Sequence, residues 1–488
     1  MSKKALTYMV SFMALSTAMS SVVSADEISA LKQQIEQLNK KIQSVESKQH
    51  ASQAKREQYH AAKEAREAQL AEKIHKIEAE NQELMLASKT TIKNGSMPGS
   101  FLVPGTNTSL KFYGYVKFDG IYTSKLYGGD NSASQSSNFA AIPLNGSQTA
   151  RRGGEFNALL KESRLGFDTQ TVQNFGVVDS RLEFDAYGSG TTGLRMRKAY
   201  VDIKGKTHEF LAGMQSTNFA DFGGTAGSET LDFGGILGTP GHRPPMLRYT
   251  ANVNPKFKVM ISAEEPETTY RATNQTEDDG SLKTLDHGSG NTMERIPDMV
   301  LHLRVGDDKA HMSFRGLVTQ QSYDDGQFQK RALGYGLAHT GRYEFDNKDS
   351  VCYDVVYGNG LGKWMTGGTT ASYIHNDDPT KRDFFLQNNL GLSIAFQHKW
   401  TQTMRSTLGL GYHKVYNRKQ MKEAQTNKAL RDIHINLIET PVQNFDIGVE
   451  YAFGHREVEK VNTTVTTNAN TRPKGSVHLF QLSAKYSF

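Results

Sequence analysis

The chain has 488 residues, of which 37% are hydrophobic and 22% charged, and its formal net charge is +6. A nucleic-acid-binding protein would need a concentrated basic stripe, and the sequence shows none. Cys352 is the only cysteine, which excludes an intrachain disulfide and a cysteine-based metal site.

Residues 1–25 are predicted to form a secretory signal peptide. Lys3 and Lys4 supply its positive end, an apolar to small-residue stretch runs from Ala5 to Met19, and small residues precede a cut at Asp26. The alternative is a short membrane anchor, but the apolar part is short and a cleavage site follows it. Export from the cytoplasm is therefore the first functional prediction.

Residues 26–90 are predicted to form an α-helical coiled coil. Ile28, Leu31, Ile35 and Leu38 recur at steps of 3 and 4, which is the spacing of a heptad seam. The seam lapses into alanines and resumes at Leu70 with a shifted phase, which indicates a stutter. A single surface helix is the alternative. The order of Ile then Leu along the seam by itself favours a coiled coil of two helices. Residues 91–109 are rich in Gly and Pro and are predicted to be a linker.

From Leu110 the apolar period changes from 3.5 to 2, which predicts β-strands. The last strand ends Phe480, Leu482, Ala484, Tyr486, Phe488, with polar residues between. Such alternation also suits a soluble β-sandwich. No apolar run after the amino terminus is long enough for a transmembrane helix, but a barrel strand crosses a membrane with only about 10 alternating residues.

Short and long connections alternate along residues 110–488, which predicts an all-β transmembrane barrel of 16 antiparallel strands with both chain ends on the periplasmic side. The predicted short turns are Thr171–Asn174, Lys204–His208, Asn252–Lys256, Gly306–Lys309, Asp346–Asp349, Trp400–Thr403 and Thr440–Asn444. The predicted long loops are Ser124–Gly154, Gly188–Gly193, Asn218–Pro245, Glu265–Arg295, Gln320–Arg331, Gly358–Asp383, Tyr416–Arg431 and Gly454–Gly475. A barrel of this size keeps an aqueous lumen, because side chains cannot fill it.

The third long loop combines glycines and prolines with apolar side chains, among them Phe219, Leu231 and Phe233. An apolar loop that faces external water is unfavourable, so we expect this loop to fold into the barrel and narrow it. A lid or a contact between subunits is the alternative, because loops usually stay on the surface.

Four stretches give the chain a resemblance to a known family. They are PGTNTSLKFYGYVKFDGIY (Pro104–Tyr122), ESRLGFDTQT (Glu162–Thr171), LRMRKAYVDI (Leu194–Ile203) and the glycine-rich third loop. The chain resembles the DcaP-type porins of Gram-negative bacteria over essentially its whole mature length. The resemblance implies a trimeric outer-membrane channel of 16 strands, a periplasmic coiled coil, and passage of small anionic solutes, dicarboxylates among them.

Selectivity in a channel depends on its width and on the charges of its wall. Inward parity and the third loop give the candidate pore-lining residues Lys117, Asp119, Arg164, Arg181, Asp221, His242, Arg243 and Arg248. Because an arginine fork binds two carboxylate oxygens, we expect Arg164, Arg181, Arg243 and Arg248 to form a basic wall opposite the third loop. The alternative for each arginine is a structural ion pair, such as Arg181 between Asp179 and Glu183. Acidic lumen positions are also numerous, so the sequence alone gives no net preference.

An outer-membrane enzyme is disfavoured because the 15 histidines occur without a HExxH or metal spacing and the chain has no GxSxG motif, and no cofactor or metal is expected. A general, non-selective porin whose coil tethers the outer membrane towards the cell wall remains open. The expected partners are outer-membrane lipid, small anionic solutes, two further copies of the chain, and the barrel-assembly machinery acting through Phe488.

Overall fold

The computed structural model describes residues 25–90, 93–125, 138–188, 193–276, 282–285, 291–366, 372–375, 379–422, 425–462 and 470–488. The predicted signal peptide lies outside the described residues except for Ala25, as do residues 91–92 of the predicted linker and parts of several long loops. The chain forms two compact units that divide after Thr91.

The first unit is one helix, α2 (Ala25–Thr90), which runs without a break for 66 residues. The predicted helix is therefore confirmed. Its predicted seam residues are exposed in the single chain, with Ile28 50%, Leu31 56% and Leu38 60% accessible. A coiled coil needs a second helix on this seam, so the coiled coil stays a prediction. None of the described helices is both long and apolar enough to cross a membrane.

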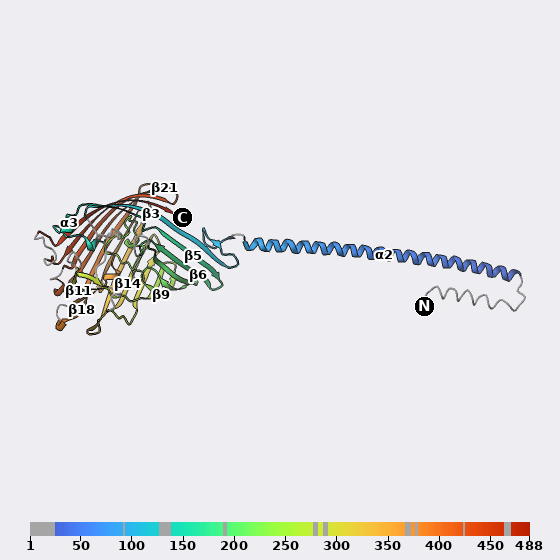
Figure 1. The fold of residues 1–488 in the computed structure, drawn as a ribbon, viewed down its shortest axis with the longest axis horizontal. Helices are drawn as coiled ribbons and strands as arrows, with labels where there is room; N and C mark the ends of the chain where they lie inside the picture. The colour runs from blue at the N-terminus through green and yellow to red at the C-terminus, as the bar shows by residue number, and fades with distance from the viewer. Residues whose placement is uncertain are drawn as a thin grey trace. The chain divides into compact units, whose positions relative to one another are not determined.

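The second unit is a closed antiparallel β-barrel (Figure 1). Its strands are β3 (Thr108–Thr123), β4 (Glu155–Leu159), β5 (Arg164–Gln173), β6 (Gly176–Asp185), β7 (Arg195–Lys204), β8 (His208–Met214), β9 (Pro245–Asn254), β10 (Phe257–Glu264), β13 (Asp298–Gly306), β14 (Ala310–Asp324), β15 (Gln329–Glu344), β16 (Ser350–Asn359), β19 (Asn388–Lys399), β20 (Met404–Tyr416), β21 (Asn427–Val442), β22 (Phe445–Val458) and β23 (Lys474–Ser487). Two short strands precede them, β1 (Lys93–Asn94) and β2 (Phe101–Leu102).

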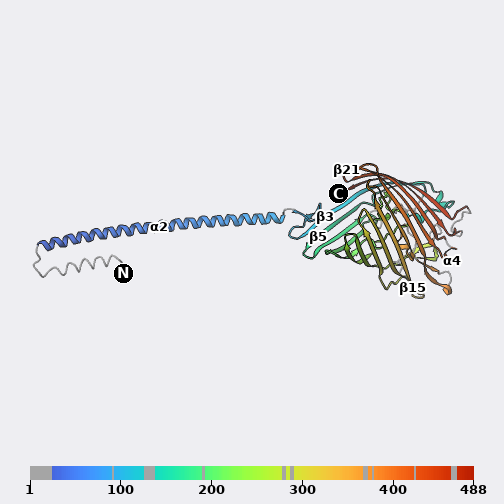
Figure 2. The ribbon, with the colours of Figure 1, turned by 180° about the vertical axis from the view of Figure 1, so that it is seen from behind.

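These strands fill 16 positions, as the sequence predicts. β4 and β5 occupy one position, because they pair with successive halves of β3. Figures 1 and 2 show β3 beside β5 from both sides. The last strand, β23, pairs with β3 and closes the barrel. Phe488 and Gly114 extend this seam by exchanging two backbone hydrogen bonds, at 3.0 and 3.2 Å.

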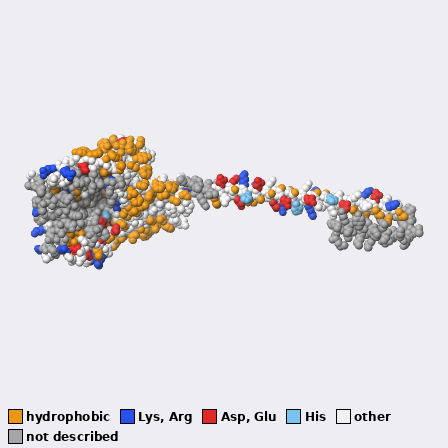
Figure 3. All heavy atoms as spheres, in the orientation of Figure 1, with side chains coloured by type: hydrophobic (Ala, Val, Ile, Leu, Met, Phe, Trp, Pro, Cys, Tyr) orange, Lys and Arg blue, Asp and Glu red, His pale blue; other side chains and the backbone are white. Residues whose placement is uncertain are grey.

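Alternation places apolar side chains on the outside of the barrel and polar ones inside. On β23, Phe480, Leu482 and Tyr486 are more than half exposed, whereas Gln481 and Ser483 between them are buried. Figure 3 shows hydrophobic side chains over much of the described outer surface of the barrel on this face. The predicted strand faces are confirmed, and this surface suits contact with lipid.

The seven predicted short turns are confirmed, because a strand ends and the next begins at each of them. The fifth predicted long loop, Gln320–Arg331, is wrong. Here β14 continues to Asp324 and β15 begins at Gln329, so the two strands form a long hairpin. Its polar residues, such as Gln321 and Ser322, are buried, and they hid the strand in the sequence pattern.

The fourth and sixth long loops build a small second sheet that the sequence did not predict. Its strands are β11 (Tyr270–Thr276), β12 (Leu282–Leu285), β17 (Ser372–His375) and β18 (Asp383–Leu386). Tyr270, Ile374 and Phe384 pack with Tyr323 at the end of β14 in one apolar cluster. Short helices lie in the loops, α3 (Gln148–Arg151), α4 (Lys419–Lys422) and the 3-10 turns η1 (Phe139–Ala141), η2 (Thr225–Gly227), η4 (Gly362–Trp364) and η5 (Pro379–Lys381).

Candidate functional site

The third long loop, residues 215–244 between β8 and β9, lies along the inside of the barrel wall; we call it the inner loop. Four strand carboxylates accept backbone N–H groups along its length. These bonds run from Asn218 to Glu264 (2.8 Å), Thr225 to Asp354 (2.9 Å), Leu231 to Glu450 (2.7 Å) and Leu237 to Asp432 (2.8 Å). A hydrogen bond to a carboxylate is stronger than one between neutral groups. The predicted inward position of this loop is therefore confirmed.

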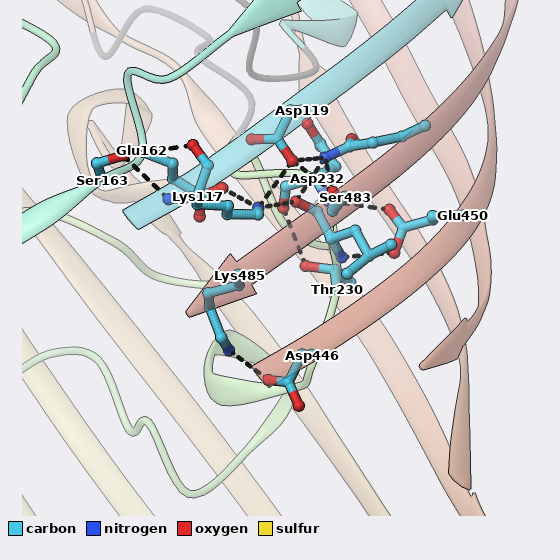
Figure 4. A network of polar contacts seen from close by, with 12 residues as sticks. Lys117, Asp119, Glu162, Ser163, Thr230, Asp232, Asp446, Glu450, Ser483 and Lys485 are labelled. Carbon is cyan, nitrogen blue, oxygen red and sulfur yellow. Dashed lines mark hydrogen bonds and ion pairs between the residues drawn. The ribbon is translucent and has the colours of Figure 1, made fainter. Parts of the chain in front are cut away.

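A polar network on β3 and β23 holds the middle of the inner loop. Lys117 on β3 and Gln481 on β23 both donate to the carbonyl oxygen of Leu231, at 2.7 and 2.9 Å. The Lys117 ammonium also pairs with Glu162 and lies 3.3 Å from Asp119. Figure 4 shows these side chains directed at one another between the strands. The positive charge of Lys117 is thus neutralised within the wall.

Glycines on the wall make room for the apolar side chains of the inner loop. An added Cβ would lie 2.8 Å from the Phe219 ring at Gly336, 2.9 Å from Leu231 at Gly448, and 2.4 Å from Ile236 at Gly409. Each glycine lies in a strand where the loop passes. Such contacts, repeated on β15, β20 and β22, explain how an apolar loop is accommodated against the inner wall.

The inward face of β5, β6 and β7 carries cations that the inner loop covers only in part. Arg164, Arg181 and Arg195 have side chains 24%, 32% and 38% exposed. On the covered side, the arginine Arg315 is fully buried against Asp354. Towards β5–β7 the loop presents the ring of Phe233, which stacks on Tyr187.

Five cations on this face and one at the end of the inner loop lie among three carboxylates; we call this set the basic wall. Its cations are Arg164, Arg181, Arg195, Arg197, Lys198 and Arg243, and its carboxylates are Asp168, Glu183 and Asp185. Arg181 binds Asp168 with two hydrogen bonds of 2.7 Å. Arg197 contacts Glu183 at 3.1 Å and Asp185 at 2.6 Å. The alternative given for Arg181, a structural ion pair, is confirmed, but its partner is Asp168 directly opposite on β5, and not Asp179 or Glu183.

A β-bulge concentrates these charges. The register between β6 and β7 shifts between Glu183 and Phe184. Lys198 therefore lies opposite Glu183 while Arg195 lies opposite Asp185, although simple alternation would place these two cations on opposite faces. Regular alternation along β7 would place Arg195 and Arg197 on the opposite face from Lys198. Their positive charge within LRMRKAYVDI was the available signal in the sequence.

Aromatic rings support the guanidinium groups of the basic wall. Arg181 lies over Tyr113 at 5.0 Å, Arg164 over Tyr115 at 5.3 Å, and Arg195 over Tyr187 at 5.1 Å. A ring beneath a guanidinium attracts its charge and leaves its N–H edge free. The rings therefore hold the arginines in place, and Arg181 and Arg195 each keep Nη1 outside their two-bond contacts with Asp168 and Asp185.

Arg243 joins the basic wall from the returning end of the inner loop. Burial and the neighbouring charges of Arg197 and Arg195 lower the pKa of Arg243 to about 10, so it remains charged at neutral pH. In the described part of the chain no carboxylate pairs with it. Beside it, burial and the charges of Lys363 and Arg243 lower the pKa of His242 to about 3. His242 is thus neutral at the same pH, although Glu267 lies 3.7 Å from its Nε2.

The eight predicted pore-lining residues divide into four groups. Arg164, Arg181 and Arg243 lie together in the basic wall, with His242 adjacent in sequence. Lys117 and Asp119 are buried in the network that holds Leu231. Asp221 belongs to the inner loop itself and is buried where it contacts His311 of β14 at 3.2 Å. Arg248 lies in a separate cavity, away from the basic wall that the sequence assigned it to. No cluster able to hold a metal ion occurs among the described side chains.

Known proteins share this architecture. The model of the DcaP outer membrane protein family matches residues 72–465. The outer membrane channel DcaP of Acinetobacter baumannii, a solved structure, is 21% identical with a TM-score of 0.62, covering 82% of this chain and 100% of that one. This likeness shows the fold.

Porins of Brucella are similar in sequence over a shorter stretch. Porin Omp2b of Brucella suis is 27% identical over 169 residues, which is 34% of this chain and 40% of that porin. Porin Omp2b of Brucella abortus (strain 2308) is 28% identical over 170 residues, 34% of this chain and 42% of that porin. The chain thus matches less than half the length of these porins. Because the family model covers most of the sequence and the fold agrees, the chain belongs to the DcaP outer membrane protein family.

Proposed function

We propose that this protein is a passive outer-membrane channel for small hydrophilic solutes and that it prefers anions, dicarboxylate-like solutes among them. Membership of an outer membrane protein family and a closed barrel with an apolar exterior support the channel. The anion preference depends on the lumen charges.

The observation that supports the anion preference is that the inner loop covers one side of the inner wall more completely than the other. The carboxylates on the covered side, such as Glu264, Asp354 and Glu450, are buried and bind backbone N–H groups of the inner loop. The arginines of the basic wall are partly exposed. Acidic and basic lumen residues are both numerous in the sequence, but the six cations of the basic wall outnumber its three carboxylates. A passing anion would therefore meet an excess of positive charge.

The test is the reversal potential of the purified protein in a planar bilayer under a KCl gradient, with succinate added afterwards. We expect an anion-side potential and transient block by succinate. Arg243→Gln should lower the anion-to-cation permeability ratio by about threefold, which corresponds to about 0.6 kcal/mol in local potential energy. Arg431→Gln is the matched control, because Arg431 pairs with Glu457 outside the basic wall. If the wild type gives a cation-side potential and no succinate block, the anion preference is contradicted and the protein is a general, non-selective porin.

A homotrimer with a periplasmic coiled coil is proposed from the family resemblance. The exposure of Ile28, Leu31 and Leu38 on α2 supports association of helices. Replacing Ile35 and Leu38 by Asn should dissociate the helical assembly. Light scattering of a peptide of residues 26–90 would then give a lower mass. Lys40→Gln, away from the seam, is the control. A monomeric wild-type peptide would contradict the coiled coil.

The second candidate function is a tether towards the cell wall. One observation favours it: α2 is continuous for 66 residues, which at about 1.5 Å per residue is roughly 99 Å long. Deletion of residues 26–90 separates the two functions. Conductance should survive the deletion, whereas a tether predicts increased detergent sensitivity of cells carrying the shortened protein. Unchanged detergent sensitivity would contradict the tether but not the channel.

Recognition of Phe488 by the barrel-assembly machinery is also proposed. Its ring is 54% exposed while its backbone pairs with Gly114, so the side chain is accessible at the closing seam. Deletion of Phe488 should lower the amount of folded barrel in the outer membrane, whereas refolding in detergent should change less. An equal loss of folded barrel in the outer membrane and in detergent would indicate that Phe488 has a purely structural role.

A further inference from the structure

A cavity of about 590 Å³ lies beneath the first part of the inner loop. Its lining includes Arg248 on β9, Arg304 on β13 and Arg342 on β15. Arg304 and Arg342 each lie two residues before the end of their strand, at a short turn. The cavity therefore opens on the short-turn side of the inner loop, and we call it the short-turn cavity.

The three arginines of the short-turn cavity are poorly neutralised. Arg304 contacts Asp308 at 3.1 Å, but the Asp308 side chain is fully exposed, which screens the pair. Asp221, the other lining carboxylate, is occupied by His311 and by the backbone N–H of Gly223 at 2.9 Å. Within the described residues, the side chain of Arg342 forms neither an ion pair nor a hydrogen bond.

Arg248 is held by a neutral group. The Gln215 amide is assigned with its oxygen towards Arg248, where it accepts hydrogen bonds of 2.8 Å from Nη1 and 3.2 Å from Nη2. The Arg248 Nε is buried without a hydrogen-bond partner in the described structure. A buried donor without a partner is unfavourable, so a ligand oxygen reaching this guanidinium would be stabilising.

We infer that the short-turn cavity binds a small oxyanion, with Arg248 and Arg342 as the principal contacts. Guanidinium groups bind carboxylate or phosphate oxygens in pairs, and the volume admits a hydrated anion of several oxygens. This inference rests on the proposed channel function, because the anion reaches the cavity through the lumen. It adds a binding site on the other side of the inner loop from the exposed face of the basic wall.

Two sites in series have a consequence for transport. Conduction requires sites that bind well enough to admit the solute and weakly enough to release it. An anion that leaves the basic wall can be held by Arg248 and Arg342 before it leaves the barrel. From the short-turn side the cavity is the first of the two sites, so blocks should begin more often when the anion is added on that side.

The experiment records single-channel current through the full mature chain in a planar bilayer, with inorganic pyrophosphate added to one side at a time. We expect resolved blocks whose residence time falls about tenfold or more in Arg248→Gln/Arg342→Gln, since each arginine supplies a charge-assisted hydrogen bond. Arg342→Lys keeps the charge but loses the planar fork, so an intermediate residence time is expected. Arg431→Gln should leave the blocks unchanged. Equal residence times in the wild type and the double variant, or no blocks in the wild type, would overturn the inference.

The outcome also separates this site from the basic wall. Arg243→Gln should shift the reversal potential while the pyrophosphate blocks persist. If Arg243→Gln abolishes the blocks and the double variant keeps them, pyrophosphate binds the basic wall and the cavity assignment fails. A cation-side reversal potential of the wild type would contradict the anion preference. Blocks that the double variant removes would still support the cavity.

Discussion

The carboxylate of Glu450 on β22 accepts the backbone N–H of Leu231 at 2.7 Å, across 219 residues of sequence. The same carboxylate accepts the N–H of Asp232 at 3.2 Å and contacts His434 at 3.1 Å. Glu450 thereby fixes the midpoint of the inner loop to the wall. Its negative charge points inwards but is covered by the inner loop, so it does not face the open lumen.

The sole cysteine reports on whether the inner loop stays on the wall. Cys352 on β16 is 4% exposed, and Ser228 of the inner loop lies 3.3 Å from its sulfur. Glu450→Gln replaces charge-assisted bonds by neutral ones, which should weaken the attachment by about 1–2 kcal/mol. We expect Cys352 to react about ten times faster with a small thiol reagent in this variant, measured by mass spectrometry.

A matched control lies on the same strand. Glu457 pairs with Arg431 and does not contact the inner loop in the described structure, so Glu457→Gln should label at the wild-type rate. Equal labelling of the Glu450 variant and the wild type would show that the loop does not depend on this carboxylate.

The ion pair between Glu229 of the inner loop and Arg405 of β20 affects the lumen charge. Two hydrogen bonds of 2.7 and 2.5 Å join them. Glu229→Gln removes a negative charge, so the anion-to-cation permeability ratio should rise by about twofold, whereas Arg405→Gln should lower it by a similar factor. Reversal potentials in a KCl gradient measure both. A change in the same direction for the two variants would point to loop displacement in place of electrostatics.

His242 should not act as a pH sensor of the channel. Burial and the charges of Lys363 and Arg243 lower its pKa to about 3, so it stays neutral from pH 8 down to about pH 4. The pH profile of the permeability ratio should therefore have the same shape in wild type and His242→Asn between pH 8 and 5. Profiles that diverge with a midpoint near pH 6.5 would mean that His242 titrates as an ordinary histidine.

Gly114 permits the closing seam of the barrel. A Cβ at this position would lie 2.3 Å from the carbonyl oxygen of Arg164 and 3.0 Å from the ring of Phe488. Gly114→Ala should destabilise the barrel by about 1–3 kcal/mol, as overpacking does. The measurement is the temperature at which the folded band converts to the unfolded band in gel electrophoresis. Gly316→Ala on β14 is the control, because nothing lies within 4 Å of its added Cβ; equal temperatures for the two variants would contradict the steric reason.

The alternation of side chains determined the barrel at the level of sequence. The period of 2 from Leu110 onwards, the strand ending at Phe488, and the order of short turns and long loops predicted 16 strands with the correct faces. This worked because a strand's two faces are fixed by local geometry, and membrane and lumen demand opposite polarity. The helix of residues 25–90 could also be predicted, because its pattern is local in the sequence. The long hairpin at Asp324 was missed because its polar residues resemble a loop.

Only the tertiary structure decided which lumen charges remain available. Arg181 and Glu450 both satisfy inward parity, yet Arg181 is partly exposed and Glu450 is buried beneath Leu231. That difference follows from the path of the inner loop, which depends on contacts more than 100 residues apart. The bulge at Glu183 likewise changed the face of Arg195, which no repeating pattern can reveal. Local periodicity encodes the direction of a side chain, whereas its exposure depends on what packs over it.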